Sequence, residues 1–158
     1  MHMKIMFVCL GNVCRSPMAE YIMKDMLKQR GITGVEIQSA ATNPYGVPSP
    51  IHPKALYQLR ARGITPDLRQ SQLLKKSDYD IFDYIVGMDS ANIRDIRSIM
   101  HGDPQHKIHR LLDFTAQARD IADPYYTENF ARCFKEIQTG CNAFLNYLYG
   151  DTGEEENE

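Results

Sequence analysis

The sequence predicts an α/β fold: a doubly wound, four-stranded parallel sheet with helices on both faces, in three layers. Runs of strand length alternate along the chain with longer segments of helical periodicity, which is the pattern of such folds. The chain has 158 residues, 43% of them hydrophobic, which is enough for one complete core. No repeat or linker divides it. We therefore expect one domain over residues 1–150, followed by an acidic, disordered tail over residues 151–158.

The first three elements form a strand–helix–strand unit. The apolar run 5–8 predicts a buried strand, and residues 35–41 alternate as a second strand does. Between them, residues 17–30 place apolar side chains on one helical face until Gly31 ends the helix. We expect the two strands to be parallel, with a right-handed crossover between them.

A proline-rich stretch separates this unit from the rest of the chain. Residues 43–53 predict a loop over the mouth of a site, whereas residues 63–77 are polar and leave their secondary structure ambiguous. The other expected elements are a helix through residues 55–59 that ends at Gly63, a strand over 84–88, a helix over 91–100 capped by Asp89, a strand over 107–112 and a long helix from Thr127.

The segment from Cys9 to Pro17 links the first strand to the first helix and predicts an anion-binding loop. Backbone N–H groups at a helix N-terminus bind anions, because they lack partners and lie at the positive end of the helix dipole. We expect Cys9 there to be largely a nucleophilic thiolate. Arg15 offers a planar fork that matches two phosphate oxygens. Gly11 permits a close backbone approach, and Ser16 supplies a hydroxyl beside the sulfur. The loop therefore predicts attack on phosphorus.

A plainer interpretation makes Cys9 a buried residue at a strand end and Arg15 a solvated residue at a helix start. The preceding strand, the glycine inside the loop and the Ser16-Pro17 pair, with Pro17 at the first helical position, all favour the anion loop instead. No Gly-Lys-Ser/Thr run follows, so the loop is not a nucleotide-binding P-loop.

Three further residues are candidates for the same site. Asp123 precedes Pro124, and a run of this kind is often only a turn before a helix. A thiolate nucleophile, however, requires a proton donor for the leaving oxygen, and we assign that role to Asp123, with Tyr125 lining the opening. Tyr45 in the proline-rich loop is either a wall for an aromatic substrate or an ordinary surface residue.

Composition argues against several other classes. A net charge of −2 gives no reason to expect nucleic-acid or membrane binding, and no apolar run approaches ~18 residues. The N-terminus has no signal-peptide pattern, so we expect a cytoplasmic protein. The histidines and the four cysteines show no metal-ligand or disulfide spacing, and we expect no metal or cofactor. Cys133 and Cys141 fall on or near the apolar stripe of the last helix and are expected in the core.

The run from Phe7 to Glu20, with Asp123-Pro124-Tyr125-Tyr126 near the end, resembles the low-molecular-weight protein-tyrosine phosphatases. Ser39-Ala40-Ala41-Thr42 and Phe82-Asp83-Tyr84-Ile85 followed by Met88-Asp89 resemble internal landmarks of that family. The resemblance covers residues 4–148, with the motifs in the family's order, and implies a flavodoxin-like α/β/α fold.

The resemblance implies hydrolysis of phosphotyrosine through a phosphocysteine on Cys9. Arg15 and the loop amides would bind the phosphoryl oxygens, and Asp123 would act first as acid and then as base. Cys14 would trap an oxidised Cys9 as a reversible disulfide. The implied partners are phosphotyrosine proteins, and the implied state is a monomer or a weak homodimer. The other implied substrate-binding residues are Leu10, Gly11, Asn12, Val13, Cys14, Ser16, Tyr45, Tyr125 and Tyr126; Asn12 with Ser39 would shape the loop, and Ser16 would stabilise the thiolate.

Three alternatives stay open. Protein-arginine phosphatases resemble this chain but carry Thr where Val13 stands, and Val13 therefore favours phosphotyrosine. An arsenate reductase would need a cysteine pair in mid-chain, where none occurs. A non-catalytic phosphate-binding module would be expected to lack Cys9 or Asp123. Residues 66–72 match the family poorly, so the sequence does not identify the side chains that support the loop.

Overall fold

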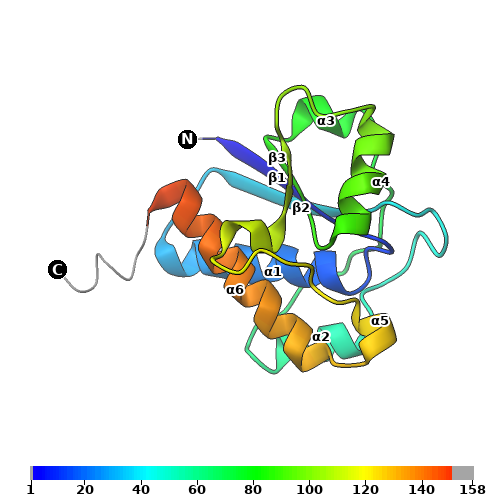
Figure 1. Cartoon of the computed structure of the whole chain (residues 1–158). Coiled ribbons are helices and arrows are strands. Elements are labelled where there is room, and N and C mark those ends of the chain that lie inside the picture. The colour runs from blue at the N-terminus through cyan, green and yellow to red at the C-terminus, as the bar shows by residue number, and fades with distance from the viewer. Residues whose placement is uncertain (1, 151–158) are drawn as a thin grey trace.

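A computed structural model of the chain, which describes residues 2–150, contains one four-stranded sheet (Figure 1). The strands are β1 (Met3–Cys9), β2 (Val35–Ala41), β3 (Tyr84–Gly87) and β4 (Ile108–Arg110), and they are ordered β2-β1-β3-β4. Every pair is parallel. The predicted fold class is confirmed: this is a doubly wound α/β sheet of the flavodoxin-like type.

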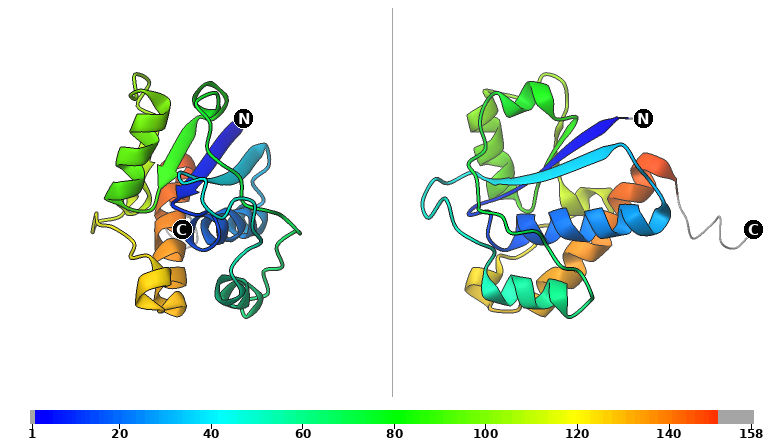
Figure 2. Two further views of the ribbon diagram at one scale, coloured as in Figure 1. Left: turned by 90° about the vertical axis from the view of Figure 1, so that its right-hand side faces the viewer. Right: turned by 180° about the vertical axis from the view of Figure 1, so that it is seen from behind.

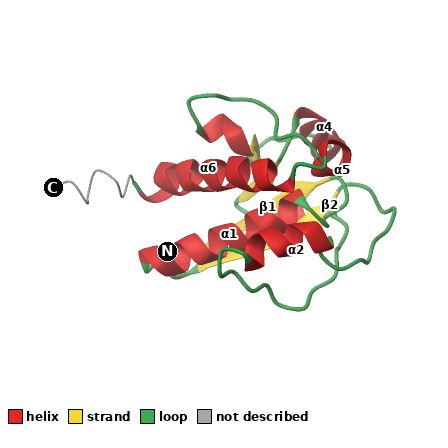
Figure 3. Cartoon of the chain, turned by 90° about the horizontal axis from the view of Figure 1, so that it is seen from below, coloured by secondary structure: helices red, strands yellow, loops and turns green. Residues whose placement is uncertain are grey.

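Helices cover both faces of the sheet (Figures 1 and 2). On one face lie α4 (Ser90–Met100) and the short α3 (Asp78–Ile81). On the other face, α1 (Arg15–Arg30) and α6 (Phe130–Tyr149) lie side by side, with α2 (Pro53–Arg60) beside their N-terminal ends (Figure 3). Two short helices, η1 (Leu111–Phe114) and α5 (Pro124–Thr127), lead from β4 to α6.

The central strand β1 is buried on both sides, because its alternate side chains enter two different cores. Ile5 and Phe7 pack with the helices α1 and α6, whereas Met6 and Val8 pack against α4. A strand that is buried on both faces is expected to form a continuous apolar run, as this one does. The strand ends at Cys9, which is itself buried.

The predicted helices and strands are present, with differences in where some of them begin and end. The first helix begins at Arg15, two residues early, so that Pro17 is its third residue and not its first. The fourth strand is shorter than 107–112, because residues 111–114 turn into η1. The helix through residues 55–59 ends at Arg60, before Gly63. The segment 63–77, which the sequence left ambiguous, has no helix or named strand, and α3 follows it unpredicted.

The helix that was predicted to start at Thr127 is two helices. Glu128 has a left-handed backbone, with φ of 60°, and ends α5 after a single turn. The side chain of Asn129 then accepts a hydrogen bond from Arg132 N at 3.0 Å and caps α6. The correction matters for the site, because Tyr125 and Tyr126 belong to the short helix α5.

The predicted tail over residues 151–158 lies outside the described residues. Within residues 2–150, no helix has both the length and the apolarity needed to cross a membrane.

Candidate active site

The segment of residues 9–16, here called the anion loop, leaves β1 at its carboxyl end and turns directly into α1. This is the point where the chain connections diverge to opposite faces of the sheet, and ligands of such folds bind there. At the start of the loop, the Cys9 sulfur accepts a hydrogen bond from Ser16 N at 3.4 Å and contacts Ser16 Oγ at 3.0 Å. The first turn of α1 thus directs a donor at the sulfur, which favours a negative charge there.

Arg15 is almost completely buried, with 2% of its side chain exposed, and its guanidinium lies among acceptors. Its Nη1 donates to Asp89 Oδ2 at 2.6 Å and to Ile121 O at 2.8 Å, and its Nη2 is 3.5 Å from Asp123 Oδ2. Burial works to lower the pKa of Arg15, but the Cys9 sulfur and the two carboxylates outweigh it and raise that pKa. The guanidinium is therefore a fixed positive charge beside the sulfur.

Asp89 holds Arg15 to the start of α4. Its Oδ1 accepts from Asn92 N at 2.7 Å, and Asp89 N donates in return to Asn92 Oδ1 at 3.1 Å. The two hydrogen bonds make a capping box. Its Oδ2 is the partner of Arg15. The sequence predicted Asp89 as the cap of this helix, and this is confirmed; its second role as the partner of Arg15 was not predicted.

A buried polar network supports the anion loop from below. Asn12 has a left-handed backbone, with φ of 56°, and donates from Nδ2 to Ser16 Oγ at 2.8 Å. Arg69 donates to both the backbone O and the side-chain Oδ1 of Asn12, and Gln72 N donates to the same Oδ1 at 3.1 Å. A non-glycine residue in the left-handed region needs such support, since that conformation is otherwise unfavourable.

The same network reaches the predicted supporting residue Ser39. Arg69 Nη2 lies 3.4 Å from Ser39 Oγ, and Ser39 Oγ donates to the buried Glu20 Oε1 at 2.6 Å. Sequence reasoning identified Asn12 and Ser39 but missed Arg69, Gln72 and Glu20. No local pattern marks Arg69 and Gln72, because they belong to the irregular segment 63–77.

The anion loop borders a pocket of about 280 Å³. Its lining from this loop consists of Cys9, Leu10, Gly11, Val13, Cys14 and Arg15, and its other lining residues are Asn43, Tyr45, Asp123, Tyr125 and Tyr126. The structure therefore brings together most of the residues that the sequence analysis proposed for substrate binding. Asn12 and Ser16 are the exceptions: they are fully buried and do not line the pocket. Asn43 is a lining residue that was not predicted.

The aromatic residues stand at the rim. Tyr45 is 93% exposed, and Tyr125 and Tyr126 are also largely exposed, with their rings nearly perpendicular at 5.2 Å. For Tyr45 the structure keeps both predicted features: the side chain is an exposed loop residue and also part of the pocket wall.

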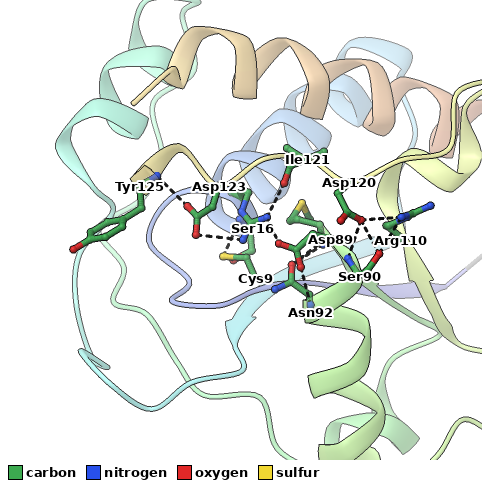
Figure 4. A network of polar contacts seen from close by, with 12 residues as sticks. Cys9, Ser16, Asp89, Ser90, Asn92, Arg110, Asp120, Ile121, Asp123 and Tyr125 are labelled. Carbon is green, nitrogen blue, oxygen red and sulfur yellow. Dashed lines mark hydrogen bonds and ion pairs between the residues drawn. The ribbon is translucent and has the colours of Figure 1, made fainter. Parts of the chain in front are cut away.

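Asp123 reaches the pocket from a second segment, residues 115–123, here called the acid loop. Its Oδ1 accepts from Tyr125 N at 3.0 Å and caps α5 (Figure 4). Its Oδ2 faces Arg15. Ile121 ties the loop down on both sides, because its N donates to Met88 O at 3.0 Å and its O accepts from Arg15. Farther out, Asp120 accepts from Ser90 N at 2.9 Å and from Arg110 Nη1 at 2.8 Å.

Cys14 lies in the pocket wall, and its side chain is buried. Burial and the negative charges of Cys9 and Asp123 raise the pKa of its thiol to about 12, so it is protonated at neutral pH. Its service as the trap for an oxidised Cys9 stays a prediction. Cys133 and Cys141 are buried in the core on α6, which confirms that prediction, and burial raises the pKa of both. Within the described residues, no three His, Cys, Asp or Glu side chains are grouped to hold a metal ion.

Comparisons with known proteins agree with this geometry. The sequence model of the family "low molecular weight phosphotyrosine protein phosphatase" matches residues 4–154. The low molecular weight protein-tyrosine-phosphatase PtpA of Staphylococcus epidermidis is 37% identical over 148 residues, which is 93% of this chain and 94% of that protein. The corresponding protein of Bacillus subtilis, YfkJ, is 39% identical over 144 residues, covering 89% of this chain and 92% of that one.

Solved structures have the same fold. A crystal structure of YfkJ superposes with a TM-score of 0.90 at 35% identity, covering 100% of this chain and 98% of that chain. A crystal structure of DARP, a Drosophila arginine phosphatase, superposes with a TM-score of 0.85 at 26% identity, covering 94% and 99%. Fold and site together define an α/β phosphatase. The chain belongs to the low molecular weight phosphotyrosine protein phosphatase family.

Proposed function

We propose that this phosphatase hydrolyses phosphotyrosine in protein substrates through a phosphocysteine on Cys9. The observation that carries the proposal is the meeting of three groups in one pocket: the sulfur at a helix N-terminus, the buried guanidinium of Arg15 and the carboxylate of Asp123. A nucleophile, an oxyanion-binding cation and a proton donor are the groups that cleavage of a phosphate ester needs.

In the first step, the phosphoryl group lies in the anion loop, with its oxygens on the loop amides and Arg15. The Cys9 sulfur attacks phosphorus, so that an S–P bond forms while the bond from phosphorus to the tyrosine oxygen breaks. Asp123 gives its proton to that oxygen as it leaves.

In the second step, a water molecule attacks the phosphocysteine. Asp123, now ionised, accepts a proton from the water as the new O–P bond forms and the S–P bond breaks. The products are inorganic phosphate and the Cys9 thiolate, and Asp123 is again protonated. Arg15 balances negative charge in both steps without moving, because Asp89 and Ile121 already hold it.

The rim of the pocket supports an aromatic phosphate ester as the substrate. Tyr45, Tyr125 and Tyr126 line the pocket that the anion loop borders, and aromatic rings associate favourably with one another. The relatives PtpA and YfkJ are named protein-tyrosine-phosphatases. Protein-arginine phosphatase is a second candidate, which the likeness to DARP favours and which Val13 disfavours.

The test is kcat/KM on two peptides that differ only in carrying phosphotyrosine or phosphoarginine. We expect a strong preference for phosphotyrosine, and Cys9→Ser should turn over neither peptide. The Val13→Thr variant, which adds a hydroxyl to the pocket wall, should shift the ratio toward phosphoarginine. A preference of the unmodified protein for phosphoarginine would keep the proposed chemistry and refute the proposed substrate. Binding of phosphate without turnover of either peptide would refute the enzymatic proposal.

A further inference from the structure

A second hollow adjoins the active-site pocket on the side of α4. Its volume is about 320 Å³, and Leu10 and Asn43 line both this hollow and the active-site pocket. The rest of its wall includes Pro44 from the loop after β2, and Asp95, Ser98 and Ile99 from the C-terminal half of α4. That loop projects beside α4 in two views (Figures 1 and 2).

The shared wall is fixed to the anion loop by backbone hydrogen bonds. Asn43 N donates to Leu10 O at 3.1 Å, and Thr42 N donates to Cys9 O at 3.0 Å. The hollow therefore keeps a constant position relative to the Cys9 sulfur. A peptide whose phosphotyrosine lies in the anion loop extends beyond the pocket, and the hollow is next to the pocket across the shared wall of Leu10 and Asn43. Neighbouring side chains of an extended peptide project on either side of its backbone.

The hollow has one charged lining group, the carboxylate of Asp95. In the part of the chain that the structure describes, this exposed carboxylate makes neither a salt bridge nor a side-chain hydrogen bond. Arg94 and Arg97 are near it in sequence but do not line the hollow. Apolar surface lies beside the charge, from Leu10, Pro44 and Ile99.

This combination of an apolar wall and one acceptor matches a long cationic side chain. Lysine and arginine lay their methylene groups along apolar surface and extend the charged group beyond it. The pocket itself does not supply such a partner for a basic residue, since Asp123 is committed to Arg15 and α5. Charge complementarity thus selects a basic side chain over an acidic one.

We propose that the hollow is a substrate subsite for a lysine or arginine close in sequence to the phosphotyrosine, with Asp95 as its charge partner. The subsite rests on the proposed function, because it orients the peptide that the active site cleaves. It is a determinant of specificity and takes no part in the chemistry.

The test is a set of phosphotyrosine peptides in which each position flanking the phosphotyrosine carries Lys, Gln or Glu in turn. At one flanking position or more, the Lys peptide should have a KM about two- to fivefold below that of the Glu peptide, with kcat nearly unchanged, as for a largely exposed ion pair. Asp95→Asn should remove most of this preference, and Asp95→Lys should reverse it. The control Asp80→Asn makes the same charge change at an exposed residue of α3 and should preserve the preference.

A small aryl phosphate separates the possible outcomes, because it does not reach the hollow. Its kcat/KM should be equal in the unmodified protein, Asp95→Asn and Asp95→Lys. Equal cleavage of the Lys and Glu peptides, or an equal loss of preference in Asp80→Asn, would overturn the subsite and leave the proposed function intact. If the protein cleaves none of the phosphotyrosine peptides, both the subsite and the proposed function are overturned.

Discussion

The two loops that meet at Arg15 are built in opposite ways. The anion loop has its key residues buried, and its shape depends on contacts with a segment about sixty positions away, where Arg69 and Gln72 hold Asn12. The acid loop is largely exposed, and only Ile121 within it is buried. Groups that bind a phosphoryl oxygen gain from being held in one place, whereas a loop at the surface can admit substrate and release product. The anion loop is thus suited to hold the phosphoryl group in a fixed place, and the acid loop is suited to let substrate enter and product leave.

The largest effect is expected for the nucleophile of the anion loop. Cys9→Ser should lower kcat by about 10⁴-fold or more, because a serine hydroxyl is neutral in the place where a thiolate attacks. The binding of phosphate should survive, since the loop amides and Arg15 are unchanged. Turnover assays and phosphate titration by calorimetry measure the two quantities. If turnover persists, the nucleophile is not Cys9.

The next largest effect is expected for Asp123 of the acid loop, and its size should depend on the leaving group of the ester. Asp123→Ala should slow hydrolysis of esters with poor leaving groups by about 10²–10⁴-fold. Esters whose leaving oxygen is already a weak base should be affected much less, because they need no proton. The measurement is the dependence of kcat on leaving-group pKa for both proteins. An equal loss across the series would exclude Asp123 as the acid.

Removing the hydrogen bonds from Arg69 that support Asn12 in the anion loop should slow the hydrolysis of all esters alike. Arg69→Met leaves the buried Oδ1 of Asn12 with one donor fewer and should cost about 1–3 kcal/mol of unfolding free energy. Denaturant melts measure that cost, and kcat should fall by the same factor for good and poor leaving groups. Arg60→Met, at an exposed arginine of α2, is the control. A loss of kcat confined to esters with poor leaving groups would mean that Arg69 acts on Asp123 instead.

The smallest effect is expected at Asp120, whose contacts with Ser90 and Arg110 form the outer tether of the acid loop. Burial works to raise the pKa of Asp120, but the hydrogen bonds from Arg110 and Ser90 outweigh it and lower that pKa, so the tether is ionic at neutral pH. Asp120→Asn should reduce kcat by less than about fivefold, and only for poor leaving groups, as befits an exposed ion pair. Asp113→Asn removes the other partner of Arg110 and should leave kcat unchanged.

The fold could be predicted because its signals are local. The run 5–8, the stop at Gly31 and the cap at Asp89 each specify an element within a few residues, and all three occur as expected. The break between α5 and α6 was missed because it has no such local signal. Glu128 adopts a left-handed conformation that favours glycine or asparagine, and no glycine or proline marks the place.

The candidate site was predictable in its chemistry and not in its supports. Cys9 and Arg15 belong to one short motif, and Asp123 to another, so residue type and spacing were enough to propose them. Arg69 is 57 positions from its partner Asn12 and lies in a segment without helix or strand. Only the folded chain shows that contact, since no periodicity indicates which residue an arginine in a loop will reach.

The position of Arg15 has a thermodynamic consequence for every substrate. A free arginine side chain loses roughly 1.5–2 kcal/mol of rotamer entropy, as TΔS at 25 °C, when it is fixed in one conformation. In this protein the loss accompanies folding, because Asp89 and Ile121 already hold the guanidinium beneath the pocket. An arriving phosphate ester therefore meets an ordered partner, and less of its binding free energy is consumed in arranging the protein around it.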